Sequence, residues 1–381
     1  MDSILEKLLM VRASEMIPLF KHYSLLGDKL PYVSLGQFPT PVQKLERLGE
    51  NMGINHLYIK RDDLSGKVYG GNKIRKLEFL LGNALRARVK EVLTFGCAGS
   101  NHCLATAIYA QQVGLKSISM LMPQPNAHYV RRNLLMSSHC GAELHLHQNM
   151  PFVVLGTIYQ LLRHRIKHGR FPQVIPTGGS SPLGVIGFIN AAFELKEQIM
   201  KGEMPEPDYI YVAAGTTGTA VGLMLGLKAA NLKSRVISVR VTGENLCNLR
   251  KMVKLSYNTN SFLHSLDPSF PKLEFSEEDM NIRHDFSGQQ YALFTREGME
   301  AVTRMKKNEG IKLDGTYTGK TFAALIDDVK KQDLRDKVLL FWCTYNSRDF
   351  SDAIITIDYN QLPQCLHHYF EEEVQPLDRH T

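Results

Sequence analysis

The sequence predicts an α/β protein in which mainly parallel sheets are covered by helices. From about residue 57, short apolar runs alternate with segments whose apolar residues recur at helical spacing. This alternation continues to about residue 343 of the 381-residue chain, which indicates parallel strands joined by helices on both faces. The composition, 44% apolar and 22% charged, is typical of a folded globular chain of two or three domains.

The apolar runs are read as strands and the periodic segments between them as helices. Strands are expected at residues 57–60, 91–95, 116–122, 143–146, 173–175, 209–214, 236–241 and 338–343. Helices are expected at residues 77–85, 103–113, 127–138, 152–167, 183–193, 220–230, 295–308 and 320–330, and residues 245–282 are expected to hold a helix and an excursion. Ligands in such folds bind at the carboxyl ends of strands, so the chemistry is expected in the loops that follow them.

The loop at residues 69–78 places a lysine at the start of a helix. Its two glycines allow a sharp bend or a close backbone approach, and Asn72 is suited to cap the helix that follows. Lys73 then lies in the first turn, where the helix dipole disfavours an ammonium ion, while Arg75 and Lys76 add like charge. Both effects lower the pKa of Lys73, as an imine-forming lysine requires. The alternative is an ordinary helix start with a surface lysine.

Three further loops place amides and hydroxyls before a helix. In residues 96–102, a serine and an asparagine can join successive amides in holding a carboxylate. In residues 215–219, three threonines and several amides form a phosphate cup, and the lack of a P-loop lysine and of a G-x-G-x-x-G pattern favours a terminal monoester. In residues 317–320, Thr318 is suited to cap a helix. Each loop taken alone also fits a plain capped turn.

Taken in order, these loops resemble the pyridoxal phosphate (PLP)-dependent family of D-cysteine desulfhydrases and 1-aminocyclopropane-1-carboxylate (ACC) deaminases. That family has the tryptophan synthase β-subunit type of fold, fold type II. The resemblance runs from about residue 35 to 340, through residues 38–41, 60–63, 70–78, 99–101, 176–190, 215–219 and 317–320. It implies two domains, each a mainly parallel sheet flanked by helices. Residues 1–75 and 178–381 would form a large PLP-binding domain, and residues 76–177 a small inserted one.

The resemblance also implies a role for each matched residue. Lys73 would hold PLP covalently and later shuttle protons, Asn101 would bond the ring hydroxyl, and Thr318 would face the pyridine nitrogen. Cofactor contacts are implied for Asn72, Lys73, Asn101, Gly215, Thr216, Thr217, Gly218, Thr219 and Thr318. Substrate contacts are implied for Ser100, Asn101, His102, Tyr291 and Tyr317, and catalytic roles for Lys73, Ser100, Tyr291 and Tyr317.

The leading interpretation is a PLP-dependent lyase that eliminates the β-substituent of D-cysteine, giving pyruvate, sulfide and ammonia. The first alternative is an ACC deaminase giving 2-oxobutyrate and ammonia, and wider ones are a serine or threonine dehydratase or a racemase. Thr318 favours elimination. ACC deaminases resemble a case with Glu at that position, which keeps the pyridine nitrogen protonated, whereas a neutral hydroxyl leaves the ring a weaker electron sink that suits a good leaving group.

The chain departs from the family pattern in two places, and the second favours a further alternative, a PLP-binding protein that has lost catalysis. The retained residues Lys73, Ser100, Tyr291 and Tyr317 argue against that alternative. The family usually has Gly-Tyr-Gly around the first tyrosine, where this chain has Gln290-Tyr291-Ala292. It usually has Thr-Gly-Gly after the last strand, where this chain has residues 344–348, Thr-Tyr-Asn-Ser-Arg. Larger side chains there would narrow or recharge the pocket, so they bear on the substrate more than on the cofactor.

Charge and cysteine content exclude other classes. The net charge of +7 is scattered, with no basic block to track a nucleic-acid backbone. The six cysteines form no C-x-x-C pair and no Cys/His run has zinc spacing, so we expect no metal site and free thiols in a cytoplasmic compartment. Residues 1–13 lack the features of a signal peptide, and no stretch approaches a membrane span. A homodimer that takes a small amino acid as substrate is expected from the resemblance.

Overall fold

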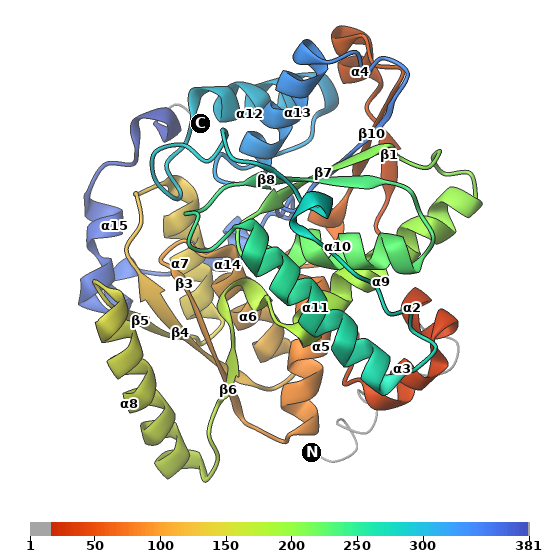
Figure 1. Cartoon of the computed structure of the whole chain (residues 1–381). Coiled ribbons are helices and arrows are strands. Elements are labelled where there is room, and N and C mark those ends of the chain that lie inside the picture. Colours follow the sequence, from red (N-terminus) through yellow and green to blue (C-terminus); the bar gives the residue numbers. More distant parts are fainter. Residues whose placement is uncertain (1–16, 380–381) are drawn as a thin grey trace.

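The computed structural model describes residues 17–379 and contains two sheets (Figure 1). The six-stranded sheet has the order β1-β2-β10-β7-β8-β9, and the four-stranded sheet the order β5-β4-β3-β6. β1 is antiparallel to β2, and the other pairs of the described strands are parallel. The strands are β1 (Val42–Lys44), β2 (His56–Lys60), β3 (Glu91–Cys97), β4 (Lys116–Met122), β5 (Glu143–Leu146), β6 (Gln173–Ile175), β7 (Tyr209–Ala214), β8 (Arg235–Arg240), β9 (Asn281–Arg283) and β10 (Val338–Trp342).

Helices connect and cover the strands, as the alternating pattern predicts. They are α2 (Pro18–His22), α3 (Ser24–Lys29), α4 (Glu46–Met52), α5 (Lys73–Arg86), α6 (Asn101–Gln112), α7 (His128–His139), α8 (Met150–His168), α9 (Pro182–Met200), α10 (Gly218–Ala229), α11 (Leu249–Leu266), α12 (Arg296–Glu309), α13 (Thr318–Lys331), α14 (Ser351–Ile354) and α15 (His368–Glu371). Every strand expected from the sequence is present with its ends shifted by at most two residues, whereas β1 and β9 were not expected. Among residues 17–379, no helix has the length and apolar content that a membrane span requires.

The four-stranded sheet comes entirely from residues 91–175, and the strands of the six-stranded sheet come from both flanking segments. An inserted smaller unit was expected on this pattern, but its exact limits stay a prediction. The expected boundary at residue 76 falls inside α5, which packs on α9 as well as on α6. The first 16 residues of the expected large domain lie outside the described residues.

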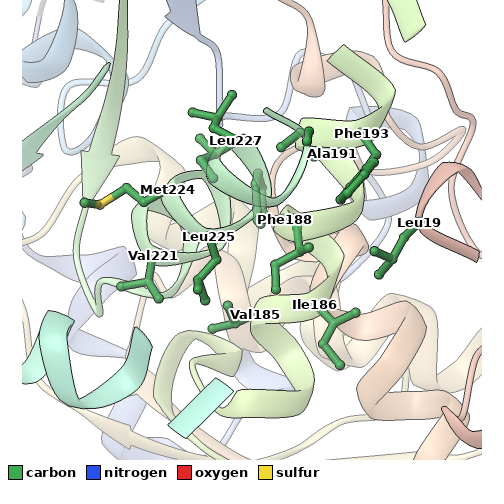
Figure 2. Close-up of a cluster of buried hydrophobic side chains, with 14 of the residues drawn as sticks. Leu19, Val185, Ile186, Phe188, Ala191, Phe193, Val221, Met224, Leu225 and Leu227 are labelled. Atoms are coloured by element: carbon green, nitrogen blue, oxygen red, sulfur yellow. The ribbon is translucent and has the colours of Figure 1, made fainter. Parts of the chain in front are cut away.

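The α9–α10 pair forms the centre of the largest hydrophobic core (Figure 2). The helices approach closely because α10 presents Gly222 and Gly226 to α9. A Cβ at Gly222 would collide with that of Phe188, and one at Gly226 would lie 2.6 Å from the Cβ of Ala192. This contact fixes the position of α10, whose first turn lies in the candidate site.

A buried ion network fixes the start of α5 in the same way. Arg75 lies 2.7 Å from Asp62 Oδ1 and 2.8 Å from Glu194 Oε2, and Lys60 Nζ lies 2.6 Å from Glu194 Oε1. Burial alone would raise the pKa of Glu194, but the two cations outweigh it and lower that pKa to about 2. The network therefore ties α5, β2 and α9 together with its charges compensated.

Candidate active site

The carboxyl ends of β3, β7 and β10 open onto one cavity of about 660 Å³. Twelve residues proposed from the sequence line it together: Asn72, Lys73, Ser100, Asn101, His102, Gly215, Thr216, Thr217, Gly218, Thr219, Tyr291 and Tyr317. Thr318, the remaining residue proposed from the sequence, does not line this cavity. The charged side chains of the lining are Lys73, Lys76 and Asp314, so the cavity favours an anionic ligand.

Lys73 is the first residue of α5, held there by a tightly packed loop. Gly70 and Gly71 are required by this packing, since a Cβ at Gly70 would collide with the carbonyl of Asp63. Gly71 has a φ of +97°, and a Cβ there would lie 2.9 Å from the carbonyl oxygen of Thr344. The loop therefore presents Lys73 to the cavity in one conformation.

The pKa of Lys73 is lowered to about 8, the direction expected from the sequence. The cause is burial, which disfavours the ammonium form. The expected contribution of Arg75 is wrong, because that guanidinium points away into the ion network with Asp62 and Glu194. Lys73 is thus a lysine whose neutral, nucleophilic form is accessible near neutral pH.

Asn72 does not cap α5, which corrects the reading from the sequence. It occupies the N-cap position, but with helical backbone angles and without a capping hydrogen bond. Its Nδ2 instead donates to Thr219 Oγ1, 3.0 Å away. The side chain thereby joins the lysine loop to the first turn of α10.

The N-terminus of α10 lacks a side-chain cap and faces the cavity. Several other helices begin with a capping side chain: Ser100, Asn149, Ser181, Asn248 and Thr295. In α10 the N-cap is Thr217, with a φ of +64°, and the first-turn amides of Thr219 and Ala220 have no acceptor within the helix. An anion in the cavity would satisfy these donors.

Lys76 brings a cation to the same place, a contribution not recognised from the sequence. Its Nζ donates to the carbonyl of Gly178 at 3.1 Å and to Ser180 Oγ at 3.2 Å, and Ser180 Oγ lies 2.7 Å from Thr216 Oγ1. Burial and then the charge of Lys73 lower the pKa of Lys76 well below its usual value. A dianionic phosphate between this lysine and the α10 amides would reverse that effect, so the residues present fit the phosphate of PLP.

Ser100, Asn101 and His102 form the start of α6. Ser100 Oγ caps the helix by accepting from Cys103 N, 3.2 Å away. Asn101 Oδ1 accepts from Tyr69 Oη and from Asn133 Nδ2, each at 3.0 Å, which leaves its NH2 group as the donor available to a ligand. His102 is almost fully buried, pairs with Thr94 Oγ1 at 3.0 Å, and has a pKa held low by burial, so it is neutral.

Tyr291 and Tyr317 also line the cavity, with their hydroxyl oxygens 2.5 Å apart. Burial raises the pKa of both phenols above the ordinary value, so both keep their protons at neutral pH. Ala292, which replaces the second family glycine, keeps a φ of +64°. The backbone conformation that suits glycine is therefore present without it.

Thr318 does not line the cavity and does not cap α13. It is the first residue of that helix, fully buried, and its Oγ1 donates to Asp314 Oδ1 at 2.5 Å. Asp314 itself lines the cavity and also accepts from the amides of Thr316, Tyr317 and Thr318. An aspartate shortly before a helix is a known capping signal. This local signal could have identified Asp314 as the residue that binds the start of α13.

Residues 344–348, which depart from the family pattern, fasten the lysine loop. Asn346 Oδ1 accepts from Gly70 N at 2.7 Å, and Arg348 Nε donates to the carbonyl of Gly66, also at 2.7 Å. Thr344 and Tyr345 line the cavity, whereas Arg348 does not. The segment therefore contributes the Tyr345 side chain to the lining, whereas the charge of Arg348 lies outside it.

One side of the cavity is apolar and was not anticipated from the sequence. It is formed by β3, β4 and the first half of α8, with Phe95, Met120, Met122, Met150, Val153, Val154 and Ile158. These residues were read as strand and helix core, since periodicity alone does not show which core residues border a cavity.

The chain is similar to known proteins along most of its length. A family model described as pyridoxal-phosphate dependent enzyme matches residues 33–344. A D-cysteine desulfhydrase of Serratia proteamaculans is 31% identical over 316 residues, which are 79% of this chain and 92% of that protein. An Arabidopsis thaliana protein named bifunctional D-cysteine desulfhydrase/1-aminocyclopropane-1-carboxylate deaminase, mitochondrial, is 34% identical over 307 residues, 78% of this chain and 73% of that protein.

Solved structures agree with the sequence matches. The crystal structure of an ACC deaminase homologue has a TM-score of 0.72 and 32% identity, covering 87% of this chain and 98% of that one. A threonine deaminase from Solanum lycopersicum, at 15% identity and a TM-score of 0.59, shares the fold. Fold type II was expected from the resemblance, and these matches confirm it. Lys76 and the first turn of α10 together form an anion cradle beside Lys73. This site and the family match agree, and the chain belongs to the pyridoxal-phosphate dependent enzymes.

Proposed function

We propose that this enzyme catalyses β-elimination from D-cysteine, giving pyruvate, sulfide and ammonia. The observation that carries the proposal is the arrangement around Lys73. Its amine, with a pKa lowered to about 8, shares one cavity with the uncapped N-terminus of α10 and with the hydroxyl pair of Tyr291 and Tyr317. The Serratia relative is named D-cysteine desulfhydrase, which supports the same substrate.

The residues that would hold the cofactor are those of the anion cradle and of the lysine loop. The amides of α10 and Lys76 bind the phosphate, Lys73 is the covalent attachment, and the Asn101 NH2 group donates to the ring hydroxyl. When bound, PLP supplies a ring that withdraws electrons and stabilises negative charge at the substrate α-carbon.

The protein's own part in the reaction is orientation and proton transfer. Ser100 and the adjacent amides of α6 bind the substrate carboxylate at a helix N-terminus, where the dipole favours an anion. The Lys73 amine removes the α-proton, since its lowered pKa leaves a useful fraction unprotonated. The Tyr291–Tyr317 pair donates a hydrogen bond to the departing thiolate.

ACC deamination is the second candidate, because the Arabidopsis relative is named for both activities and both pocket tyrosines are present. The charge of the site favours D-cysteine. Position 318 is a neutral threonine, and Asp314, the only carboxylate among the described residues of the lining, accepts from four donors of the α13 start. Both oxygens of Asp314 are thus already used, and no carboxylate of the described lining is left to keep the pyridine nitrogen protonated. The cofactor ring is then a weaker electron sink.

A side-by-side assay tests the proposal. D-cysteine, L-cysteine, ACC and D-serine are compared at equal concentration, with sulfide, pyruvate, 2-oxobutyrate and ammonia measured. We expect sulfide and pyruvate from D-cysteine at the highest kcat/KM. Faster turnover of ACC would make the argument from Thr318 and Asp314 wrong, and lack of turnover of all four would favour a binding protein without catalysis.

We further propose that the enzyme is a homodimer that associates through α8. Phe152, Leu155, Tyr159, Leu162 and Ile166 recur at intervals of three and four residues on this helix and are all more than half exposed. An apolar stripe of this kind is typical of a contact surface. Sedimentation at micromolar concentration should show a dimer, and Leu155→Glu should shift it towards monomer. A monomeric unaltered protein would contradict the proposal.

For the compartment we propose the cytoplasm. The six cysteines are all free, and four of them are buried, as in proteins of reducing compartments. Fractionation of the source cells with antibody detection tests this. Recovery of the protein in an organelle fraction would contradict it.

A further inference from the structure

Two histidines and a glutamate converge where β3 begins and α8 ends, away from the candidate active site. Glu91 is the first residue of β3, and His164 and His168 lie one turn apart at the end of α8. One ligand atom from each residue lies within 4.8 Å of the other two. His164 Nδ1 is 2.6 Å from Glu91 Oε2, and His168 Nε2 is 3.2 Å from Glu91 Oε1.

Both distances are in the range of an ion pair, but neither ring nitrogen makes a hydrogen bond of good geometry to the carboxylate. His164 Nδ1 and His168 Nε2 are both buried and have no hydrogen-bond partner within residues 17–379, despite their distance from the carboxylate. The His164 side chain is fully buried, and Glu91 is 3% exposed. Two imidazole nitrogens and a carboxylate that converge in a buried place can take a cation between them, which would widen the 2.6 Å pair to about 3.3 Å.

The surroundings of His164 support the same reading. Its Nε2 lies 3.3 Å from Glu143 Oε2, so Nε2 can donate to that carboxylate while Nδ1, which faces Glu91, binds a metal ion. Metal-bound histidines typically donate their second nitrogen to a carboxylate in this way. Arg163 Nη1, 2.9 Å from Glu143 Oε2, holds that carboxylate in place.

We propose that Glu91, His164 and His168 bind a divalent transition-metal ion of the zinc class. Two imidazole nitrogens and one carboxylate oxygen are the ligand set that Zn²⁺ accepts, with bonds of about 2.0–2.2 Å and ligand atoms about 3.3 Å apart in a tetrahedron. His168 is 21% exposed, so water can take the fourth position.

The site is structural rather than catalytic by its position. β3 runs from Glu91 to Cys97, so the two ends of this strand lie about 20 Å apart, and the candidate active site is at the other end. The metal would join the last turns of α8 to β3, and the first turns of the same helix form the apolar side of the cavity. The sequence predicted no metal site because Glu91 is far along the chain from the two histidines.

The test uses the PLP-loaded enzyme with its purification tag removed, stripped with a chelator and dialysed against Zn²⁺. Metal analysis should give one zinc per chain, and zinc should raise the melting temperature of the stripped protein. His168→Ala, the partly exposed ligand, should lose most of the bound zinc, whereas the control His139→Ala, an exposed histidine on α7, should keep it.

A second variant separates loss of the ligand from loss of the fold. Glu143→Gln keeps the size of the side chain and removes only the outer carboxylate, so it should weaken zinc binding by about 10–100-fold with the visible PLP absorbance unchanged. The proposal is overturned if the unaltered enzyme keeps no zinc after dialysis, which would mark a protonated histidine–glutamate cluster. It is equally overturned if His168→Ala and His139→Ala keep the same amount.

Discussion

The hydroxyl oxygens of Tyr291 and Tyr317 lie 2.5 Å apart inside the cavity that also contains Lys73. At this distance one phenol donates to the other, so the pair has a single proton left for a ligand. Burial raises the pKa of both groups, which keeps that proton in place at neutral pH. The two tyrosines therefore act as one donor, and removing either hydroxyl affects the other.

We expect Tyr291→Phe and Tyr317→Phe each to lower kcat for D-cysteine by roughly 10²-fold or more, the contribution typical of a positioned proton donor. The double variant should be little worse than either single one, because both remove the same function. Tyr257→Phe, at a 70% exposed tyrosine, is the control. Full activity in either single variant, measured as sulfide release, would show that the pair does not act on the substrate.

Replacing Lys73 should abolish covalent cofactor binding. Lys73→Ala is expected to lose the visible absorbance of lysine-bound PLP and nearly all turnover, since the attachment and the proton carrier are the same amine. Lys67→Ala removes an exposed lysine just before the lysine loop and should retain both the absorbance and the turnover. An unchanged spectrum in Lys73→Ala would assign the attachment to another lysine.

The rate of PLP capture should follow the lowered pKa of Lys73. Only the neutral amine attacks the aldehyde, and with a pKa of about 8 instead of 10.5 its fraction rises roughly tenfold between pH 6 and 7 and levels off above about 8. Stopped-flow absorbance of the cofactor-free protein mixed with PLP measures this. A model lysine in solution, which should keep accelerating to pH 10, is the control. Protein that behaves like the model lysine would contradict the lowered pKa.

The anion cradle can be tested by charge at Thr217. Thr217→Glu places a carboxylate beside the phosphate position, so we expect PLP to bind at least tenfold more weakly. Thr217→Gln has the same size and the same backbone strain at a φ of +64° without the charge. Titration of the cofactor-free variants with PLP gives both affinities, and equal weakening in the two would point to strain instead of charge.

The buried ion network should contribute to stability. Glu194→Ala leaves Arg75 and Lys60 buried without their shared partner, which should cost about 3–5 kcal/mol of unfolding free energy. Glu197→Ala, on the same helix, breaks only a surface pair with Lys21 and should cost less than about 1 kcal/mol. Denaturant unfolding of the PLP-loaded variants compares them. Since the pKa of Glu194 is lowered to about 2, its contribution holds above about pH 4.5 and is lost as pH falls through 2.

The sequence was sufficient for the parts of the fold that depend on local pattern. Apolar runs of four to seven residues located strands such as β4, and glycine or hydroxyl residues after them located the loops of the site. β1 and β9 were missed because neither has an apolar run: β1 is Val-Gln-Lys, β9 is Asn-Ile-Arg, and both lie at edges of the sheet. Short polar strands depend on a neighbour for their existence, which no local pattern records.

Long-range contacts explain the errors in the site. Arg75 was expected to repel Lys73, but Asp62 and Glu194 neutralise it, and Glu194 is 119 residues away along the chain. Residues 344–348 were expected to narrow or recharge the pocket, but Arg348 binds the carbonyls of Leu64 and Gly66, just before the lysine loop. In both cases the positive charge was recognised, but the direction of the side chain could not be predicted, because its partner comes from another part of the chain.

The hydrogen bond from Gly70 to Asn346 also bears on how the protein is made. The lysine loop is near the beginning of the chain, yet it is fastened by side chains that leave the ribosome some 270 residues later. Until then the lysine loop lacks its hydrogen bonds to Thr344 and Asn346, and the six-stranded sheet beside it still lacks β10. Cofactor capture is therefore expected to follow completion of synthesis, and a bound cofactor is a sign that translation reached the end of the fold.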